Sequence, residues 1–386
     1  MTRSLRGNDQ AMPWPVILLM SVITLLAIIS ELLPAGLLRE MGESLSADYS
    51  MVGQFVGAYA LTAALGAIPV TRLVTKVNRR PLLIAVVLGF GLGNLLTAIS
   101  PYFWLVMGAR LIGGVCAGLM WSMLAAYTLQ MVPAAHAGRA VTLVFSGSTI
   151  GLSLGVPLMT YIGQAMHWRL AFGMVALGFF IVAALGYKLL PSVPGQSSAH
   201  LISPKDMVKN RNVMMVVVLT FLFVCAHYTS YVYIQMIAER LGMGLQAMQI
   251  VFGLGAICAV VAVARLIDDH LKSIMLTVFI IGIIAMAIFI WGASSLWLGF
   301  IGMFLWGLSF GPISTLMQTA TTRQTSEGQD IAISLQTTSF DLSIMIASGV
   351  GAFLLKSFGL SATLLFAIFM FVLGLALVVT HPKNFE

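Results

Sequence analysis

The sequence predicts an all-α integral membrane protein with twelve transmembrane helices arranged in two six-helix bundles. Of its 386 residues, 59% are hydrophobic and only 9% are charged, whereas a water-soluble domain carries about 25% charged residues. The mean hydropathy is +1.00. Many apolar runs reach the roughly 20 residues that a helix needs to cross a bilayer. Lipid, and not water, is therefore the expected solvent for most of this surface.

Charged residues and Gly or Pro breaks divide the chain into twelve apolar spans. We expect every span to be a helix, because backbone polar groups in lipid must be satisfied within their own segment. The first span is too long for a cleaved signal peptide and carries Glu31 and Pro34 in its core. The predicted spans are 14–38, 50–73, 81–100, 102–130, 139–163, 169–190, 212–238, 246–266, 273–293, 295–319, 330–355 and 360–380.

The distribution of Lys and Arg predicts how the protein sits in the membrane. If the N-terminus is cytoplasmic, fifteen of the 20 Lys and Arg residues face the cytoplasm, four face outward, and Arg110 lies inside a span. Cytoplasmic loops carry such an excess of positive charge. We therefore expect both termini in the cytoplasm. The net charge of +7 reflects these basic residues of the cytoplasmic loops. No solvated basic domain that could bind nucleic acid is visible in the sequence.

The longest polar connection lies between the sixth and seventh spans and contains Pro, Gly and Ser. It suggests an N-terminal bundle over 1–190, a cytoplasmic linker over 191–211 and a C-terminal bundle over 212–386. A shift by half the chain length places Gly114 and Gly118 on Gly307 and Gly311. This weak coincidence agrees with two structural repeats, between which many transporters bind their substrate near mid-membrane.

Four ionisable residues lie well inside the spans, namely Glu31, Arg110, His227 and Asp341. An ionisable group at that depth costs several kcal/mol unless it faces a cavity or a partner, so each is a candidate functional residue. At 1.5 Å per residue, Glu31 lies about 12 Å and Arg110 about 13–14 Å below the outer edge of the membrane.

Glu31 and Arg110 could therefore pair, or compete for one proton. An apolar site disfavours the charged form of a carboxyl group and a nearby guanidinium favours it, so relative movement would load and release a proton. Pro34, close behind Glu31, weakens the helix at this level and could let it bend. The alternative is a static Glu–Arg lock, and Arg110 alone is equally suited to a structural hub.

Asp341 lies close to mid-membrane and is either a second proton site, an acceptor for substrate hydroxyls, or a neutral helix-packing acid. Span seven contains "AHYTSYVYIQ", which places four polar or aromatic side chains at helical spacing: His227, Tyr228, Tyr231 and Gln235. Such a face suits hydroxylated ligands, although Tyr also gathers at membrane interfaces. Weaker substrate-binding candidates, equally compatible with interhelical hydrogen bonds, are Asn94, Gln318 and Gln336.

Catalytic and metal-binding motifs are not predicted. "GLSLG", Gly151 to Gly155, matches a serine-hydrolase pattern, but that pattern requires a strand–turn–helix context. Within a lipid-length helix, Gly147, Gly151 and Gly155 instead indicate close helix packing. No nucleotide-binding loop, zinc motif or cofactor motif is visible, so we expect neither an enzyme nor an ATP-driven pump.

Several segments resemble the major facilitator superfamily, in particular bacterial drug:proton antiporters of the sugar efflux (arabinose-efflux-like) branch and related purine-nucleoside efflux proteins. The resemblance covers most of the chain and is stronger in its first half. The segments that carry it are "SELLPAGLL", "VNRRPLL", "GARLIGG", "GLSLGVPL", "HWRLAF", "LLPSVPG" and "AHYTSYVYI".

The resemblance implies a proton-driven exporter in which the acid of span one falls on Glu31 and the arginine of span four on Arg110. The antiporter motif of span five falls on Gly151, Gly155 and Pro157, with Val156 inserted before the Pro. The gating motif of the loop between spans two and three falls on Arg79 and Arg80, but its acid and second glycine are missing. Asp341 stands where related sequences carry an amide.

We therefore expect a proton-coupled secondary transporter, acting as a monomer, that exports small solutes such as sugars or related hydroxylated compounds by alternating access. Its energy source would be the proton gradient, without a cofactor. Multidrug or nucleoside efflux by the same mechanism is the first alternative, because the Met- and Phe-rich spans also suit lipophilic solutes. A non-coupled channel or receptor is a further one.

Overall fold

A computed structural model describes residues 12–67, 74, 77–132, 137–194, 204–292, 295–325 and 329–381. Regular secondary structure in these segments is helical, which confirms the predicted class. Within these described segments, eleven stretches are long and apolar enough to cross a membrane. The predicted span 50–73 corresponds to the helix Tyr49–Ala67, and its residues 68–73 lie outside the described part of the chain.

The first group of helices precedes the polar connection. It consists of α1 (Trp14–Gly36), α2 (Leu38–Leu45), α3 (Tyr49–Ala67), α5 (Arg79–Ile99), α6 (Phe103–Leu129), α7 (Ala137–Ile150), the π-helix η2 (Gly151–Gly155), α8 (Val156–Ala165) and α9 (Trp168–Leu189). Within it, α1 packs on α7 and α9, α3 on α6, and α5 on α6 and α9.

The second group consists of α10 (Pro204–Met207), α11 (Arg211–Tyr231), α12 (Ile234–Leu241), α13 (Leu245–Trp291), α14 (Leu296–Phe310), α15 (Ile313–Arg323), α16 (Gln329–Phe358) and α17 (Leu360–Thr380). α13 contains two predicted spans and is broken at His270, whose φ of −131° is not helical. Here α13 packs on α14 and α17, and α11 packs on α16 and α17.

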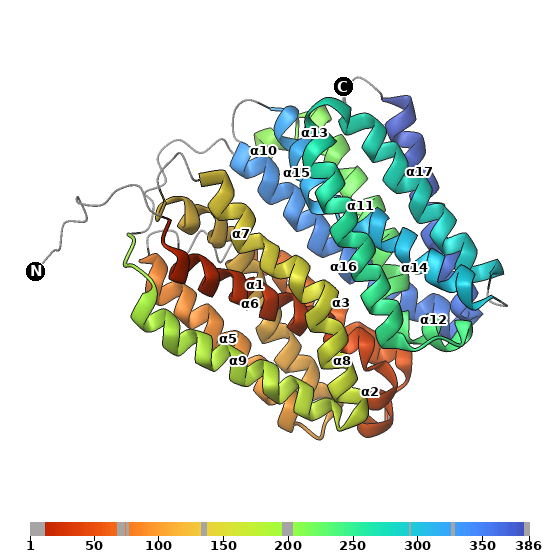
Figure 1. The fold of residues 1–386 in the computed structure, drawn as a ribbon, viewed down its shortest axis with the longest axis horizontal. Coiled ribbons are helices and arrows are strands. Elements are labelled where there is room, and N and C mark those ends of the chain that lie inside the picture. Colours follow the sequence, from red (N-terminus) through yellow and green to blue (C-terminus); the bar gives the residue numbers. More distant parts are fainter. Residues whose placement is uncertain are drawn as a thin grey trace, which may run out of the picture.

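The two groups lie side by side in Figure 1 and come together where α2, α8 and α12 lie. Contacts between the groups join α3 to α16, α13 to η2 and α8, and α1 to α12. The start of α1 and the end of α17 share one end of the molecule, and α2 and α12 occupy the opposite end. We call these the terminal end and the distal end.

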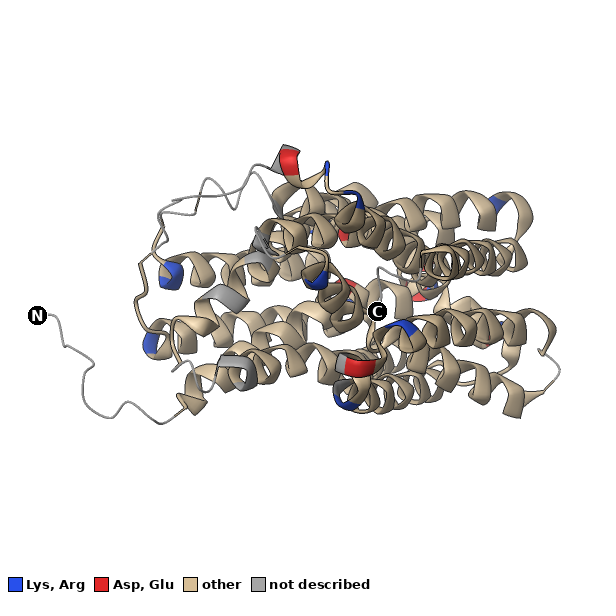
Figure 2. Ribbon diagram, turned by 90° about the horizontal axis from the view of Figure 1, so that it is seen from above, with Lys and Arg blue, Asp and Glu red and all other residues tan. Residues whose placement is uncertain are grey.

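The outer surface of the helices suits lipid. Most of the ribbon in Figure 2 carries neither acidic nor basic residues. Large exposed apolar side chains occur along the spans, and Tyr102, Trp104, Trp291 and Trp297 are at least 70% exposed near the distal end. Aromatic residues gather at membrane–water interfaces in this way.

Candidate functional site

Glu31 lies in α1 at the contact between the two groups of helices. Its side chain is 8% exposed, and its Oε1 accepts a hydrogen bond of 3.3 Å from the hydroxyl of Tyr228 in α11. This contact joins the first group to the second at the depth where the sequence predicted a functional acid. Tyr228 was predicted to bind substrate, which stays a prediction, and in this structure its hydroxyl is the partner of Glu31.

Arg110 of α6 is buried beside Glu31 but contacts the backbone instead of the carboxylate. Its Nη1 donates to the carbonyl of Ser30 at 2.7 Å, its Nη2 to the carbonyl of Glu31 at 3.0 Å, and its Nε to the carbonyl of Phe55 at 3.3 Å. Tyr59 covers the guanidinium, with its ring centroid 4.5 Å from Cζ. The equal depth of Arg110 and Glu31 is as predicted, whereas the ion pair suggested by the sequence is not formed in this structure.

Asp341 of α16 approaches the same place from the second group. It is half-buried and interacts electrostatically with Glu31, Tyr59 and Tyr228. The ion pairs found within the described segments, Arg39–Glu43 and Lys209–Asp206, lie elsewhere on exposed side chains. Two acids from different groups thus converge at one interface, and a tyrosine hydroxyl bridges the groups at Glu31.

His227 is buried in an aromatic cluster of the second group and does not line an open surface. It is 1% exposed, its ring stacks on Phe310 at 3.5 Å between centroids, and Trp306 lies 5.2 Å away. Tyr231 belongs to the same cluster, 5.1 Å from His227, and is 2% exposed. The sequence analysis took this face as suited to hydroxylated ligands, and in the present conformation these two side chains are buried among aromatic rings.

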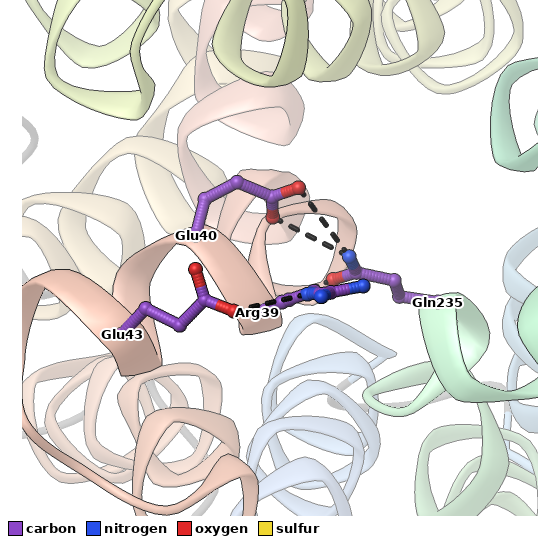
Figure 3. Close-up of polar contacts among 4 residues, drawn as sticks. All are labelled: Arg39, Glu40, Glu43 and Gln235. Carbon is purple, nitrogen blue, oxygen red and sulfur yellow. Dashed lines mark hydrogen bonds and ion pairs between the residues drawn. The ribbon is translucent and has the colours of Figure 1, made fainter.

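Gln235 of α12 is 5% exposed and joins the two groups of helices at the distal end (Figure 3). Its Oε1 accepts from the backbone N–H of Arg39 at 3.1 Å, and its Nε2 lies 3.4 and 3.5 Å from the two carboxylate oxygens of Glu40. Burial raises the pKa of the half-buried Glu40 above its ordinary value. The exposed Arg39 has its pKa raised by its hydrogen bond to Glu43. We call Arg39, Glu40 and Gln235 the distal latch.

The other predicted amides have different surroundings. Asn94 is 2% exposed; its Nδ2 donates to the Ser30 hydroxyl at 2.9 Å and to the Phe90 carbonyl at 2.9 Å, so it ties α5 to α1. Gln336 is buried with its Oε1 unpartnered, and Gln318 is exposed on α15. Asn94 is thus an interhelical hydrogen-bonding residue, and of the three amides only Gln318 is open to solvent.

Span five packs closely against two helices, α1 and α13. A Cβ on Gly151 would lie 2.7 Å from the carbonyl oxygen of Leu25, and one on Gly155 2.5 Å from Cδ1 of Ile29, so α1 packs directly on these glycines. On the other side, Ser153 Oγ donates to the Gly253 carbonyl of α13 at 3.2 Å. Here the chain forms η2, followed by Pro157 near the start of α8. π-Helical turns occur often at functional sites.

Arg79 and Arg80 begin α5 at the terminal end. Asn78 caps this helix by accepting from the Arg80 N–H at 3.0 Å. The N–H of Arg79 donates to the Val193 carbonyl at 2.9 Å, and the Arg80 guanidinium contacts the Tyr187 carbonyl and ring. Thr75 and Lys76, which precede Arg79 and Arg80 in the loop between predicted spans two and three, lie outside the described residues.

Sequence reasoning missed two groups at the site. Tyr59 was not singled out although it covers Arg110, and no periodic signal distinguishes it from an ordinary buried ring. Ser30 precedes Pro34 by four residues, and this spacing predicts that the Ser30 carbonyl lacks its helical partner. The sequence therefore contained a signal by which Ser30 could have been found.

At the distal end, the hydrogen bond of 2.5 Å from Gln246 to Gln164 also joins the two groups. Within the described residues, no group of three or more His, Cys, Asp or Glu is arranged to hold a metal ion.

Comparison with known proteins agrees with this architecture. Residues 19–329 match the family model described as Major Facilitator Superfamily. The chain is 25% identical over 335 residues to a "Probable sugar efflux transporter" of Helicobacter pylori (strain ATCC 700392 / 26695), covering 86% of each chain. It is 26% identical over 353 residues to the protein of the same name from Pasteurella multocida (strain Pm70), covering 89% of this chain and 87% of that one.

Two solved structures are similar in fold. The crystal structure of the human organic anion transporter MFSD10 (TETRAN) aligns with a TM-score of 0.73 at 16% identity, over 96% of this chain and 100% of that one. A D-xylose-proton symporter aligns with a TM-score of 0.74 at 15% identity, over 94% and 96%. At these identities the likeness concerns the fold alone.

Proposed function

Because this chain belongs to the Major Facilitator Superfamily and is a secondary transporter, we propose that it exports small hydroxylated solutes, sugars foremost, in exchange for protons. The observation that supports coupling is the placement of Glu31. It is buried at the contact between the two groups of helices and is hydrogen-bonded across that contact to Tyr228. Movement of the groups would break this bond and change the surroundings of the carboxyl group, and therefore its affinity for a proton.

The proposal that the solute is a sugar rests on the relatives, whose names describe probable sugar efflux transporters. The half-buried Asp341 and the exposed Gln318 offer acceptors and donors for solute hydroxyls. A thermal-shift screen over sugars, nucleosides and lipophilic cations tests this point. Stabilisation by sugars alone supports it, and stabilisation by nucleosides or cations alone favours the corresponding alternative.

We propose that both termini face the cytoplasm of a bacterial inner membrane. Arg79, Arg80 and Lys188 lie at the terminal end, whereas fewer basic residues lie at the distal end, as expected for cytoplasmic loops. In this orientation the distal latch closes the outer face. Residues 1–190 and 212–386, joined by a linker over 191–211, would then rock about Glu31 as two units within a monomer.

The decisive experiment is uphill export by the purified protein in proteoliposomes, with proton movement recorded on addition of solute. We expect Glu31→Gln to abolish coupled export while solute binding survives, because the amide keeps the shape but cannot carry the proton. Glu43→Gln is the matched control, since Glu43 is an exposed acid at the distal end. Uphill export that persists in Glu31→Gln would remove Glu31 from the mechanism.

A further inference from the structure

The carbonyl of Ser30 has lost the partner that a regular helix would give it. In an α-helix each carbonyl accepts from the N–H four residues later, and for Ser30 that residue is Pro34, which lies inside α1 and has no N–H. The proline ring also crowds this carbonyl. Ser30 is fully buried, so water does not replace the missing donor, and an unpaired buried carbonyl is costly.

Arg110 supplies the missing donor. Its Nη1 donates to the Ser30 carbonyl at 2.7 Å, and its Nη2 donates to the next carbonyl, that of Glu31, at 3.0 Å. The planar guanidinium presents its N–H groups as a rigid fork, which matches two successive carbonyls of one helix. A third N–H, on Nε, fixes the guanidinium to α3 through the Phe55 carbonyl.

The local packing is built so that Arg110 reaches this place. A Cβ on Gly114 would overlap the carbonyl of Tyr59, so α6 approaches α3 without an intervening side chain. The Tyr59 ring then covers the guanidinium face. Three of the five donors of Arg110 are used on backbone carbonyls, while its charge remains close enough to Glu31 to act electrostatically.

We infer that Arg110 is a positioning residue, which seats Glu31 by capping the Ser30 carbonyl that Pro34 leaves free in α1, together with the adjoining Glu31 carbonyl. This role rests on the proposed function of Glu31 as the proton carrier. It differs from a Glu31–Arg110 ion pair, because the bonds go to the backbone and would persist when the Glu31 carboxyl group gains or loses its proton. α1 therefore keeps its conformation around Pro34, and with it the direction in which Glu31 points, through the transport cycle.

The test removes the donor that Arg110 provides and supplies the missing backbone N–H at residue 34 in its place. We expect Arg110→Met to lower coupled export about tenfold or more, because it leaves two carbonyls of α1 and the Phe55 carbonyl of α3 without this donor, and to lower the melting temperature by several degrees. Pro34→Ala supplies an N–H at residue 34 that can bond the Ser30 carbonyl. The double variant Arg110→Met/Pro34→Ala should recover both quantities at least in part, and Arg110→Lys should not replace Arg110, since one ammonium lacks the fork.

The readouts are melting temperature, initial rate of coupled export, and the pH profile of that rate. The groups around Glu31 that could affect the profile are Tyr59, Arg110, Tyr228 and Asp341. We expect the profile of Arg110→Met to move from that of the unmodified protein and to return in the double variant. A purely structural loss would lower the rate without moving the profile.

Asn94→Ala combined with Pro34→Ala is the specificity control, because Asn94 bonds the Ser30 hydroxyl and not its carbonyl. Pro34→Ala should therefore not rescue Asn94→Ala. The inference is overturned if Arg110→Met/Pro34→Ala recovers neither stability nor export, if it recovers stability alone, or if Arg110→Lys is as active as the unmodified protein. None of these outcomes decides the role of Glu31, which the Glu31→Gln experiment tests separately.

Discussion

The Tyr228 hydroxyl reaches from α11 into the first group of helices and donates to Glu31 Oε1 at 3.3 Å. The rest of its ring is held by aromatic neighbours, with His227 at 5.1 Å and Phe310 at 6.0 Å between centroids. The hydroxyl position is therefore fixed by the second group, while the carboxylate belongs to the first. Any displacement between the groups acts directly on this bond.

Tyr228→Phe removes the donor and keeps the ring. A hydrogen bond of this kind contributes about 1 kcal/mol, or more when one partner is charged, so we expect coupled export to slow by about fivefold or more. Tyr231→Phe is the control, because Tyr231 is equally buried in α11 and makes no described hydrogen bond to Glu31. Initial rates in proteoliposomes provide the comparison. Equal rates in both variants would show that the contact does not influence transport.

Single residues also show how far sequence reasoning reaches. Depth along a helix follows from residue counting, so Glu31 and Arg110 were placed at the same level correctly. The atoms that they contact depend on rotation about the helix axes and on the partner helices, which one sequence does not specify. For this reason Arg110 was expected beside the carboxylate and lies against the carbonyls. His227 was expected in a cavity and lies in an aromatic cluster.

Among the elements, the contact of α1 with span five depends most on missing side chains. A Cβ on Gly147 would overlap the backbone carbonyl of Ser21, and this carbonyl belongs to a helix that cannot move without disturbing Glu31. We expect Gly147→Ala to destabilise the protein by about 1–3 kcal/mol through overpacking. Gly108→Ala in α6 is the matched control, since a Cβ there meets no atom within 4 Å.

The control should be neutral or stabilising by up to about 1 kcal/mol, because Ala favours a helix over Gly. Thermal unfolding in detergent, together with export in proteoliposomes, measures both variants. Equal stability of Gly147→Ala and Gly108→Ala would contradict the close approach of α1 to α7. The small-residue spacing from Gly147 to Gly155 indicated a packing stripe in the sequence, and α1 is the helix that occupies it.

Most of the elements could be predicted because the bilayer imposes a length and a composition on each span. Among the described residues, eleven stretches meet both conditions, and the remaining predicted span is the helix α3, which packs on α6 and α16. The break of α13 at His270 falls between two predicted spans, whereas the π-turn of η2 was not predicted. The π-turn depends on local backbone geometry, to which hydropathy is insensitive.

At the scale of the whole molecule, the distal end joins the two groups through polar side chains. Gln235 bonds Arg39 and Glu40, Gln246 bonds Gln164, and Gln164 in turn donates to the Gly36 carbonyl at the end of α1 at 3.2 Å. Hydrogen bonds of this kind contribute only about 1 kcal/mol each, so the distal end can open without a large cost. A reversible closure of this end is what alternating access requires.

Glu40 gives this closure a pH dependence whose sign follows from its burial. Burial raises the pKa of Glu40 in the closed latch, and opening would return the carboxyl group to water and to its ordinary value. The proton is therefore bound more tightly in the closed form, so closure is favoured at low pH and weakened as pH rises through the pKa of the closed latch. The charged groups that also act on Glu40 are Arg39 and Glu43.

Spin labels at Ser46 and Ala247, both exposed near the distal end, can follow the latch after the native cysteines are replaced. When the pH is lowered from about 7.5 to about 4.5, which is close to the ordinary pKa of a free glutamate, we expect the population with the shorter distance to grow. Glu40→Gln should remove this dependence, because the amide does not titrate, and Gln235→Leu should favour the open form at every pH because it deletes the bonds to Arg39 and Glu40. A distance distribution that responds to pH equally in Glu40→Gln would assign the effect to another group and remove the latch from the control of the outer face.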